Sequence, residues 1–294
     1  MALHTDEQRT EQGHEQPDGQ EHGDAQNKGG LQQQVEHVQQ QAQGQVEQAA
    51  QRVERERYQR GRITKRGTAL LIGYVIALAA VVGLSLAAHA FSVLPGDLGF
   101  SLELQESRYP AIFDLMYGIS LFGYLPWSVI VEVAALAILW LLRLRIEAIF
   151  LALTLLADGL GGLIKLLVDR HRPSASLVHV STTLSSPGFP SGHTVHYTVF
   201  FGFILYILLV NFRPSWRRNL LVTICALLIA LIGVSRVYLG EHWLSDVVGG
   251  YLVGALCLIP IIYGYLWARR RYGERMDRLR LFPLRHRRQQ GRAA

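Results

Sequence analysis

The stretch FPSGHTVHYTVFFGFILYILLVN, residues 189–211, places a proline, a serine, a glycine and a histidine directly before a long apolar run. The run from 193 to 211 has about the length that a helix needs to cross a hydrocarbon core of ~30 Å. Polar side chains beside such a run are costly in lipid and are often functional. The stretch therefore predicts a membrane-spanning helix with a functional site at its N-terminal end.

Further apolar runs lie on both sides of this stretch. Irregular backbone is too costly in lipid, so each run is expected to be a helix. The predicted fold class is all-α, an integral membrane bundle of six transmembrane helices at 68–90, 125–142, 146–168, 193–211, 220–239 and 243–267. Residues 110–123 are expected to form a short amphipathic segment along the outer interface, before the second span.

Arginine and lysine are concentrated before the first span, in alternate connections and after the last span. The positive-inside rule places these segments in the cytoplasm, so both termini are predicted to be cytoplasmic. The connections 91–124, 169–192 and 240–242 then face the extracytoplasmic side. With no N-glycosylation or organelle signal recognised, we expect a multi-pass protein of a plasma (inner) membrane.

The polar ends flank a predicted membrane domain at 63–268. Residues 1–62 are expected to be a largely disordered cytoplasmic tail, because they contain too few apolar residues to offset the entropy of ordering. A weak apolar stripe within 31–57 leaves three alternatives open: a solvated helix, disorder, or a coiled-coil contact with a cytoplasmic partner. Residues 269–294 form a basic cytoplasmic tail that suits anionic headgroups.

The net charge and the cysteines argue against a nucleic-acid-binding protein and against a disulfide-stabilised protein. The formal net charge of +6 suits a membrane surface, and no interleaving of aromatic and basic residues indicates a nucleic-acid site. Cys225 and Cys257 both fall within predicted spans, so buried free thiols are expected rather than a disulfide framework.

Three polar clusters fall on the predicted extracytoplasmic face, and the first is KLLVDRHRP at 165–173. Lys165 and Arg172 are seven residues apart, a spacing that places both on one side of a helix, where they can bind one anion. The alternative is that Lys165 pairs with Asp169 and that the arginine only snorkels to the interface.

The second cluster is PSGH at 190–193. Ser191 is suited to cap a helix, and Gly192 allows a ligand to approach the backbone, so first-turn N–H groups can bind an anion such as phosphate. The alternative is an ordinary capped helix that happens to be followed by a histidine.

The third cluster is SRVYLGEHWLSD at 235–246. His242 and Asp246 are four residues apart, so the carboxylate can accept a hydrogen bond from one imidazole nitrogen and leave the other as a nucleophile. An interfacial histidine beside a helix-capping acid is the alternative.

Together the clusters resemble the signature of the type 2 phosphatidic acid phosphatase superfamily. That signature is Lys, six residues, Arg-Pro; then Pro-Ser-Gly-His; then Ser-Arg, five residues, His, three residues, Asp, and every position is present in this sequence. The resemblance covers roughly residues 68–267, and the apolar spans favour the membrane-bound lipid phosphatase branch. It implies a phosphatase that needs no metal and no other cofactor.

The resemblance also implies a role for individual residues. His242 is implied as the nucleophile that forms a phosphohistidine, Asp246 as its orienting acid, and His193 as the general acid that protonates the leaving oxygen. The implied phosphate-binding groups are Lys165, Arg172, Ser191, the N–H of Gly192, and Arg236.

Placement at an outer rim favours a phosphorylated lipid, whose tail stays in hydrocarbon. A polyprenyl diphosphate such as undecaprenyl diphosphate, phosphatidylglycerol phosphate and phosphatidic acid all fit. Two alternatives remain: a phosphotransferase that passes the phosphoryl group to a lipid or sugar hydroxyl, and a non-catalytic lipid-binding scaffold. The complete signature argues against the scaffold.

Further polar residues fall inside predicted spans. His193 and His196, with His242 and Asp246, suggest a zinc site as a minor alternative, which the surrounding positive charge disfavours. Glu132 and Asp158 lie near the middle of spans, where they either share a proton, line a water pocket, or have a hydrogen-bonded structural role.

Overall fold

The computed structural model describes residues 67–107 and 109–277, together with single positions between 41 and 55. The chain divides into two units, Met1–Leu70 and Leu71–Ala294. In the first unit the described positions between 41 and 55 are helical. The rest of the predicted tail 1–62, and residues 278–294 of the predicted basic tail, lie outside the described residues.

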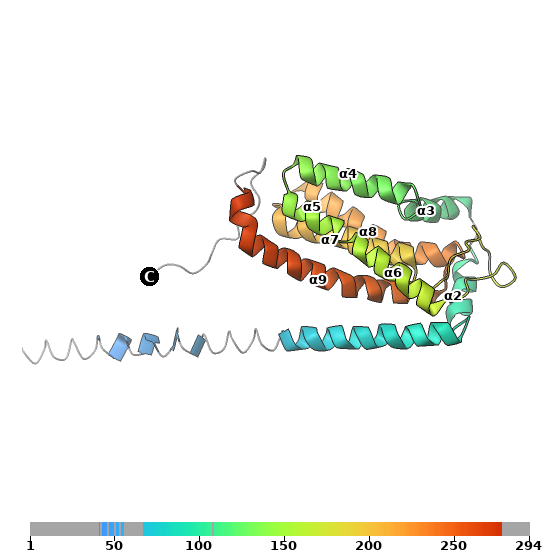
Figure 1. Cartoon of the computed structure of the whole chain (residues 1–294), viewed down its shortest axis with the longest axis horizontal. Coiled ribbons are helices and arrows are strands. Elements are labelled where there is room, and N and C mark those ends of the chain that lie inside the picture. Colours follow the sequence, from blue (N-terminus) through green and yellow to red (C-terminus); the bar gives the residue numbers. More distant parts are fainter. Residues whose placement is uncertain are drawn as a thin grey trace, which may run out of the picture. The chain divides into compact units, whose positions relative to one another are not determined.

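Within 67–107 and 109–277 the regular structure is entirely helical, and this part of the chain contains no strand (Figure 1). The predicted all-α class is therefore confirmed for the described residues. The helices are Gly67–Ala90, α2 (Asp97–Leu104), α3 (Pro110–Leu121), α4 (Trp127–Leu141), α5 (Arg145–Ala152), α6 (Leu155–Val168), α7 (Gly192–Asn211), α8 (Trp216–Tyr238) and α9 (Leu244–Asp277).

Five helical runs in the described residues are long and apolar enough to cross a membrane. They correspond to predicted spans, and the run Arg145–Val168 contains both α5 and α6, with a turn at 153–154 between them. The remaining predicted span, 125–142, is represented by α4, which has 15 residues. A helix of that length extends only about 22 Å, less than the ~30 Å of a hydrocarbon core.

Two helices differ from the predictions in ways that the structure explains. Helix α8 begins four residues before the predicted start at 220, because the Ser215 hydroxyl accepts a hydrogen bond from the Arg218 backbone N–H (3.3 Å) and caps the helix. Helix α2 was not predicted at all. Its buried residues are Asp97 and Ser101, so it has no apolar stripe for a sequence pattern to detect.

Helix α7 is the central element of the bundle. In the most apolar 18-residue stretch of α7, 56% of the residues are buried, against 6% in the corresponding stretch of the helix Gly67–Ala90. Glycines let α9 approach α7 closely: a Cβ at Gly250 would lie 2.8 Å from Thr194 Cβ, and one at Gly254 would lie 2.7 Å from Thr198 Cβ. Such small residues at four-residue spacing are typical of close helix packing in membranes. This contact fixes the N-terminal ends of both helices side by side.

Candidate active site

The three polar clusters predicted to share one face meet in space. The Ser191 backbone N–H donates to the Asp246 backbone carbonyl at 3.0 Å, which joins the second cluster to the third. Arg172 Nη1 lies 3.0 Å from His242 Nε2, which joins the first cluster to the third. The clusters therefore form one site at the adjoining ends of α6, α7, α8 and α9.

The predicted pair of His242 and Asp246 is formed. His242 Nδ1 lies 3.3 Å from Asp246 Oδ2, and both side chains are almost fully buried. A guanidinium can only donate hydrogen bonds, so the contact from Arg172 requires a lone pair on His242 Nε2. The proton of the neutral imidazole is then on Nδ1, where it is donated to Asp246. This tautomer leaves the Nε2 lone pair on the side of Arg172.

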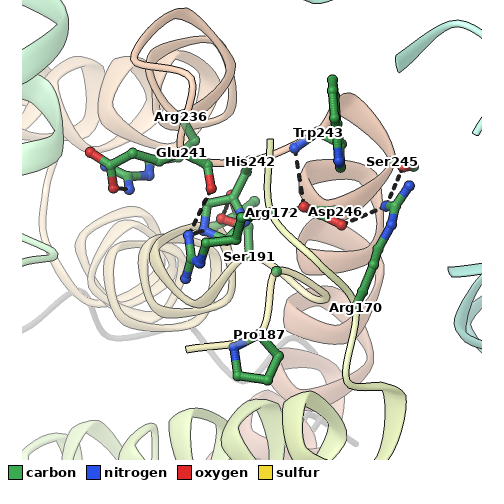
Figure 2. A network of polar contacts seen from close by, with 12 residues as sticks. Arg170, Arg172, Pro187, Ser191, Arg236, Glu241, His242, Trp243, Ser245 and Asp246 are labelled. Atoms are coloured by element: carbon green, nitrogen blue, oxygen red, sulfur yellow. Dashed lines mark hydrogen bonds and ion pairs between the residues drawn. The ribbon is translucent and has the colours of Figure 1, made fainter. Parts of the chain in front are cut away.

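Asp246 is held by a network that no spacing rule predicted (Figure 2). Its Oδ1 accepts from Arg170 Nη1 at 2.6 Å, and its Oδ2 accepts from the Trp243 backbone N–H at 3.0 Å. Arg170 Nη2 also donates to Asp97 of α2 at 2.7 Å, and Asp97 accepts from the Ser245 backbone N–H at 2.9 Å. The network links α2 to the start of α9 and fixes the carboxylate that orients His242.

Lys165 and Arg172 both lie at the site. However, they do not lie on one side of a single helix, as their spacing predicted. Helix α6 ends at Val168, so Arg172 reaches the site from the following loop. Lys165 Nζ donates to the Pro187 carbonyl (2.9 Å), and Arg172 Nε donates to the neighbouring Ser186 carbonyl (2.7 Å). Lys165 is thus directed to this loop rather than to the alternative partner Asp169.

Arg236 is fully buried and is held by groups from other segments. Its Nη1 donates to Ser120 Oγ (3.1 Å) and to Tyr124 OH (2.7 Å), and its Nη2 forms an ion pair with Glu241. Tyr124 OH also donates to Glu241, which closes a ring of three side chains. The Arg236 guanidinium lies over the Tyr124 ring, 5.1 Å from its centroid.

Ser191 occupies the N-cap position of α7, as predicted, but its hydroxyl makes no side-chain cap hydrogen bond. Instead the hydroxyl accepts from Thr194 Oγ1 at 3.0 Å. Since this contact uses an oxygen lone pair, the Ser191 O–H proton remains a donor for a ligand. A Cβ at Gly192 would lie 3.5 Å from Lys165 Cε, so the helix start and the lysine enclose the same small space.

His193 is packed between two neighbouring residues of the α3–α4 connection. Its ring meets Tyr124 edge-on, with the centroids 4.5 Å apart. Its Nε2 is buried and has no hydrogen-bond partner among the described residues. A Cβ on Gly123 would lie only 2.2 Å from His193 Cδ2, so only glycine leaves space for this ring.

Replacing this glycine gives a prediction. In Gly123→Ala the new methyl group must displace the His193 imidazole, so we expect kcat to fall at least tenfold, as small misplacements of reacting groups do. The measurement is phosphate release by the purified variant. Gly118→Ala is the matched control, because no atom lies within 4 Å of its added Cβ. Equal kcat in both variants would contradict the placement of His193.

The surroundings of His242 lower its pKa well below 6.5, because burial disfavours the charged imidazole and the Arg172 and Lys165 cations repel it further. Burial, and then Arg236, lowers the pKa of Arg172 to about 10, so it remains charged at neutral pH. The site therefore combines a neutral imidazole with cationic donors.

The pKa of His242 can be measured directly. We expect the His242 resonances of ¹³C-histidine-labelled protein to titrate below pH 6.5, because protonation is delayed until the pH falls to the lowered pKa. The His242→Gln spectrum assigns the signal. As the imidazole protonates it loses the Nε2 lone pair, so kcat/KM falls on the same acidic side. A His242 titration at or above its ordinary value would contradict this environment.

The polar residues of the span centres form a separate group. His196 Nδ1 lies 3.0 Å from Asp158 Oδ2, and its ring stacks on Phe200. Asp158 therefore pairs with His196 and not with Glu132, whose Oε1 is buried without a hydrogen-bond partner among the described residues. His196, which the zinc alternative requires, is paired with Asp158. No three His, Cys, Asp or Glu side chains of the described ranges are grouped so as to hold a metal ion.

Comparison with known proteins places this site in a family. The model of the PAP2 superfamily matches residues 147–271, which include all three clusters. Phosphatidylglycerophosphatase B of Bacillus subtilis (strain 168) is 31% identical over 186 residues, which are 62% of this chain and 89% of that protein. The chain belongs to the PAP2 superfamily. Membership confirms the resemblance drawn from the signature, and at the level of the family it confirms the prediction of a lipid phosphatase enzyme.

Other PAP2 relatives agree with this assignment. Lipid A 4'-phosphatase of Porphyromonas gingivalis is 29% identical over 195 residues, covering 61% of this chain and 77% of that protein. The crystal structure of a transmembrane PAP2 type phosphatidylglycerolphosphate phosphatase from Bacillus subtilis superimposes with a TM-score of 0.56 at 24% identity, over 70% of this chain and 98% of that one. This last likeness shows that the fold is shared.

Several residues of this PAP2 site were given no role from the sequence. Glu241 directly precedes His242 and Arg170 precedes Arg172 by two residues, so both lay inside the quoted clusters. Tyr124 and Asp97 lie outside the clusters and outside the matched range 147–271. No pattern in their own segments indicated that they contact the site.

Proposed function

We propose that this PAP2 protein removes the terminal phosphate of a phosphorylated lipid through a phosphohistidine on His242, without a metal ion. The observation that carries the proposal is the state of His242, with Nδ1 against Asp246 and the Nε2 lone pair turned toward Arg172. An imidazole in this tautomer is ready to attack phosphorus, and the adjacent cations match the charge of a phosphate.

In the first step His242 Nε2 forms a bond to phosphorus while the bond from phosphorus to the leaving oxygen breaks. A phosphate bound between Arg172 and His242 takes over the Arg172 donor, which frees the Nε2 lone pair. Asp246 stabilises the positive charge that develops on the imidazole. Phosphoryl transfer needs mainly positioned hydrogen-bond donors. We assign this role to a phosphate clamp, which consists of Lys165, Arg172, Ser191, the Gly192 N–H and Arg236.

His193 supplies the proton that the leaving oxygen needs. Its Nε2 has no protein partner among the described residues, which supports its assignment as the group that meets this oxygen. In the second step water attacks the phosphohistidine, and the released products are inorganic phosphate and free His242. His193, now deprotonated, accepts the proton of that water.

We propose that the site faces the extracytoplasmic side of the plasma (inner) membrane, in a six-span arrangement with both termini cytoplasmic. In this arrangement the bilayer thins locally around the short helix α4. The positions of the basic residues support this orientation. All three clusters lie at one end of the spans, where a lipid headgroup can enter while its tail stays in hydrocarbon. Undecaprenyl diphosphate, phosphatidylglycerol phosphate and phosphatidic acid are the candidate substrates, and the name of the Bacillus subtilis relative favours the second.

Hydrolysis of these lipids in the presence of EDTA tests the proposal. We expect detergent-purified protein to release inorganic phosphate from at least one of the three lipids at a rate that EDTA does not change, because cationic side chains take the place of a metal. The assay is repeated with an added lipid or sugar hydroxyl acceptor. Loss of activity in EDTA would contradict the metal-independent mechanism, and transfer to the acceptor in place of phosphate release would favour the phosphotransferase.

A further inference from the structure

Glu241 is the one carboxylate that bonds an arginine of the predicted phosphate clamp in the described part of the chain. It is 1% exposed, and its carboxylate accepts from three side chains, Arg236, Tyr124 and Ser181. Its backbone carbonyl accepts from Arg172 Nη1 at 2.7 Å. One residue therefore contacts both arginines of the clamp, next to the proposed nucleophile (Figure 2).

The ring formed with Tyr124 determines which donors of Arg236 remain for a ligand. Arginine has five N–H donors. Both hydrogens of Nη1 are used by Ser120 and Tyr124, and one hydrogen of Nη2 is used by Glu241. The Nε–H is buried without a partner among the described residues, so Nε–H and one Nη2–H remain. Two donors are what a bidentate contact with phosphate requires.

Glu241 has two opposite effects on phosphate binding. By positioning Arg236 it favours binding, whereas its negative charge weakens binding. Lys165, Arg172 and Arg236 concentrate positive charge at a site that must release a phosphate anion after each turnover. A buried carboxylate bonded to one of these cations weakens the attraction for that anion, because charges a few ångströms apart interact strongly in a protein interior. Without it, the clamp would retain its product more tightly.

We propose that Glu241 is a positioning residue and internal counter-ion of the phosphate clamp. It holds Arg236 with two donors directed to the substrate phosphate, and it limits the net charge of the clamp so that inorganic phosphate dissociates. The inference rests on the proposed function, since it concerns the same site.

Two variants separate the two effects. Glu241→Gln keeps an oxygen acceptor for Arg236 but removes the charge, so we expect orthovanadate, a phosphate mimic, to bind about tenfold more tightly. The inhibition constant for inorganic phosphate should fall by a similar factor. Glu241→Ala removes the acceptor as well, so kcat/KM should fall about a hundredfold, as it does when a transition-state donor is lost.

The measurement is calorimetric titration of the full-length, detergent-purified proteins with orthovanadate, beside their kinetics. Glu147→Gln is the matched control, because this carboxylate of α5 is also fully buried and paired with an arginine, Arg269. It bonds Asn211 at the far end of α7, about 27 Å along that helix from His193. Its vanadate affinity should equal that of the wild type. A role in folding alone would reduce the yield of both variants without tightening vanadate binding.

Vanadate binding by Glu241→Gln that is equal to or weaker than wild-type binding would overturn the counter-ion role. Wild-type kcat/KM in Glu241→Ala would overturn the positioning role. A wild-type protein that binds vanadate but hydrolyses none of the lipids would contradict the proposed function alone, since the comparison of vanadate affinities remains measurable. A wild type that binds no vanadate would contradict both.

Discussion

We expect His242→Ala to lower phosphate release by a factor of about 10⁴ or more, because no other group in the site can take the place of the nucleophile. The Nε2 atom that attacks phosphorus is lost, whereas the cationic clamp remains. Substrate binding should therefore persist while kcat collapses. The measurement is single-turnover phosphate release from the best lipid substrate.

His171→Ala is the matched control for this prediction. His171 belongs to the same group of clusters but is exposed, and the mechanism gives it no role. Its activity should match that of the wild type. A His242→Ala protein that retains more than about a hundredth of the wild-type rate would show that another group carries the phosphoryl transfer.

The largest effect on stability is expected for Arg170→Met. Arg170 is fully buried between Asp97 and Asp246, and its removal leaves two buried carboxylates without their cation. Breaking a buried ion pair from one side costs about 3–5 kcal/mol. We expect the free energy of unfolding to fall by that amount, measured by denaturation in mixed micelles.

Arg270→Met, at an exposed arginine of α9, is the control and should leave the free energy of unfolding nearly unchanged. The double variant Arg170→Met, Asp97→Asn should recover part of the loss, because one of the two uncompensated charges is then absent. Stability of Arg170→Met equal to that of Arg270→Met would contradict the described network.

The apolar runs predicted most of the membrane domain because length and hydropathy are local properties of the chain. Five of the predicted spans correspond to long apolar helices in the described residues. The turn inside Arg145–Val168 was not predictable in this way, because the predominantly apolar composition continues on both sides of it. Helix α2 was missed for the opposite reason, since it buries Asp97 and Ser101 in a polar network and not in an apolar core.

The signature predicted which residues meet at the site. It did not predict the contacts with other segments that hold these residues in position. The spacing of His242 and Asp246 predicted their contact, although His242 lies two residues before α9 and only Asp246 lies in its first turn. Tyr124 contacts Glu241 across 117 residues of sequence, and Ser245 contacts Asp97 across 148 residues. Such contacts depend on how α2 and the α3–α4 connection pack against the bundle, which no local spacing encodes.

Trapping of the covalent intermediate tests the central claim most directly. The purified protein is mixed with the lipid phosphate, quenched in alkali within the first turnover, and digested for mass spectrometry, because a phosphohistidine survives alkali but not acid. The account predicts a phosphate on His242 that appears before inorganic phosphate and is absent from His242→Ala. Phosphate release without a phosphorylated His242, or a phosphate trapped on another residue, would contradict it.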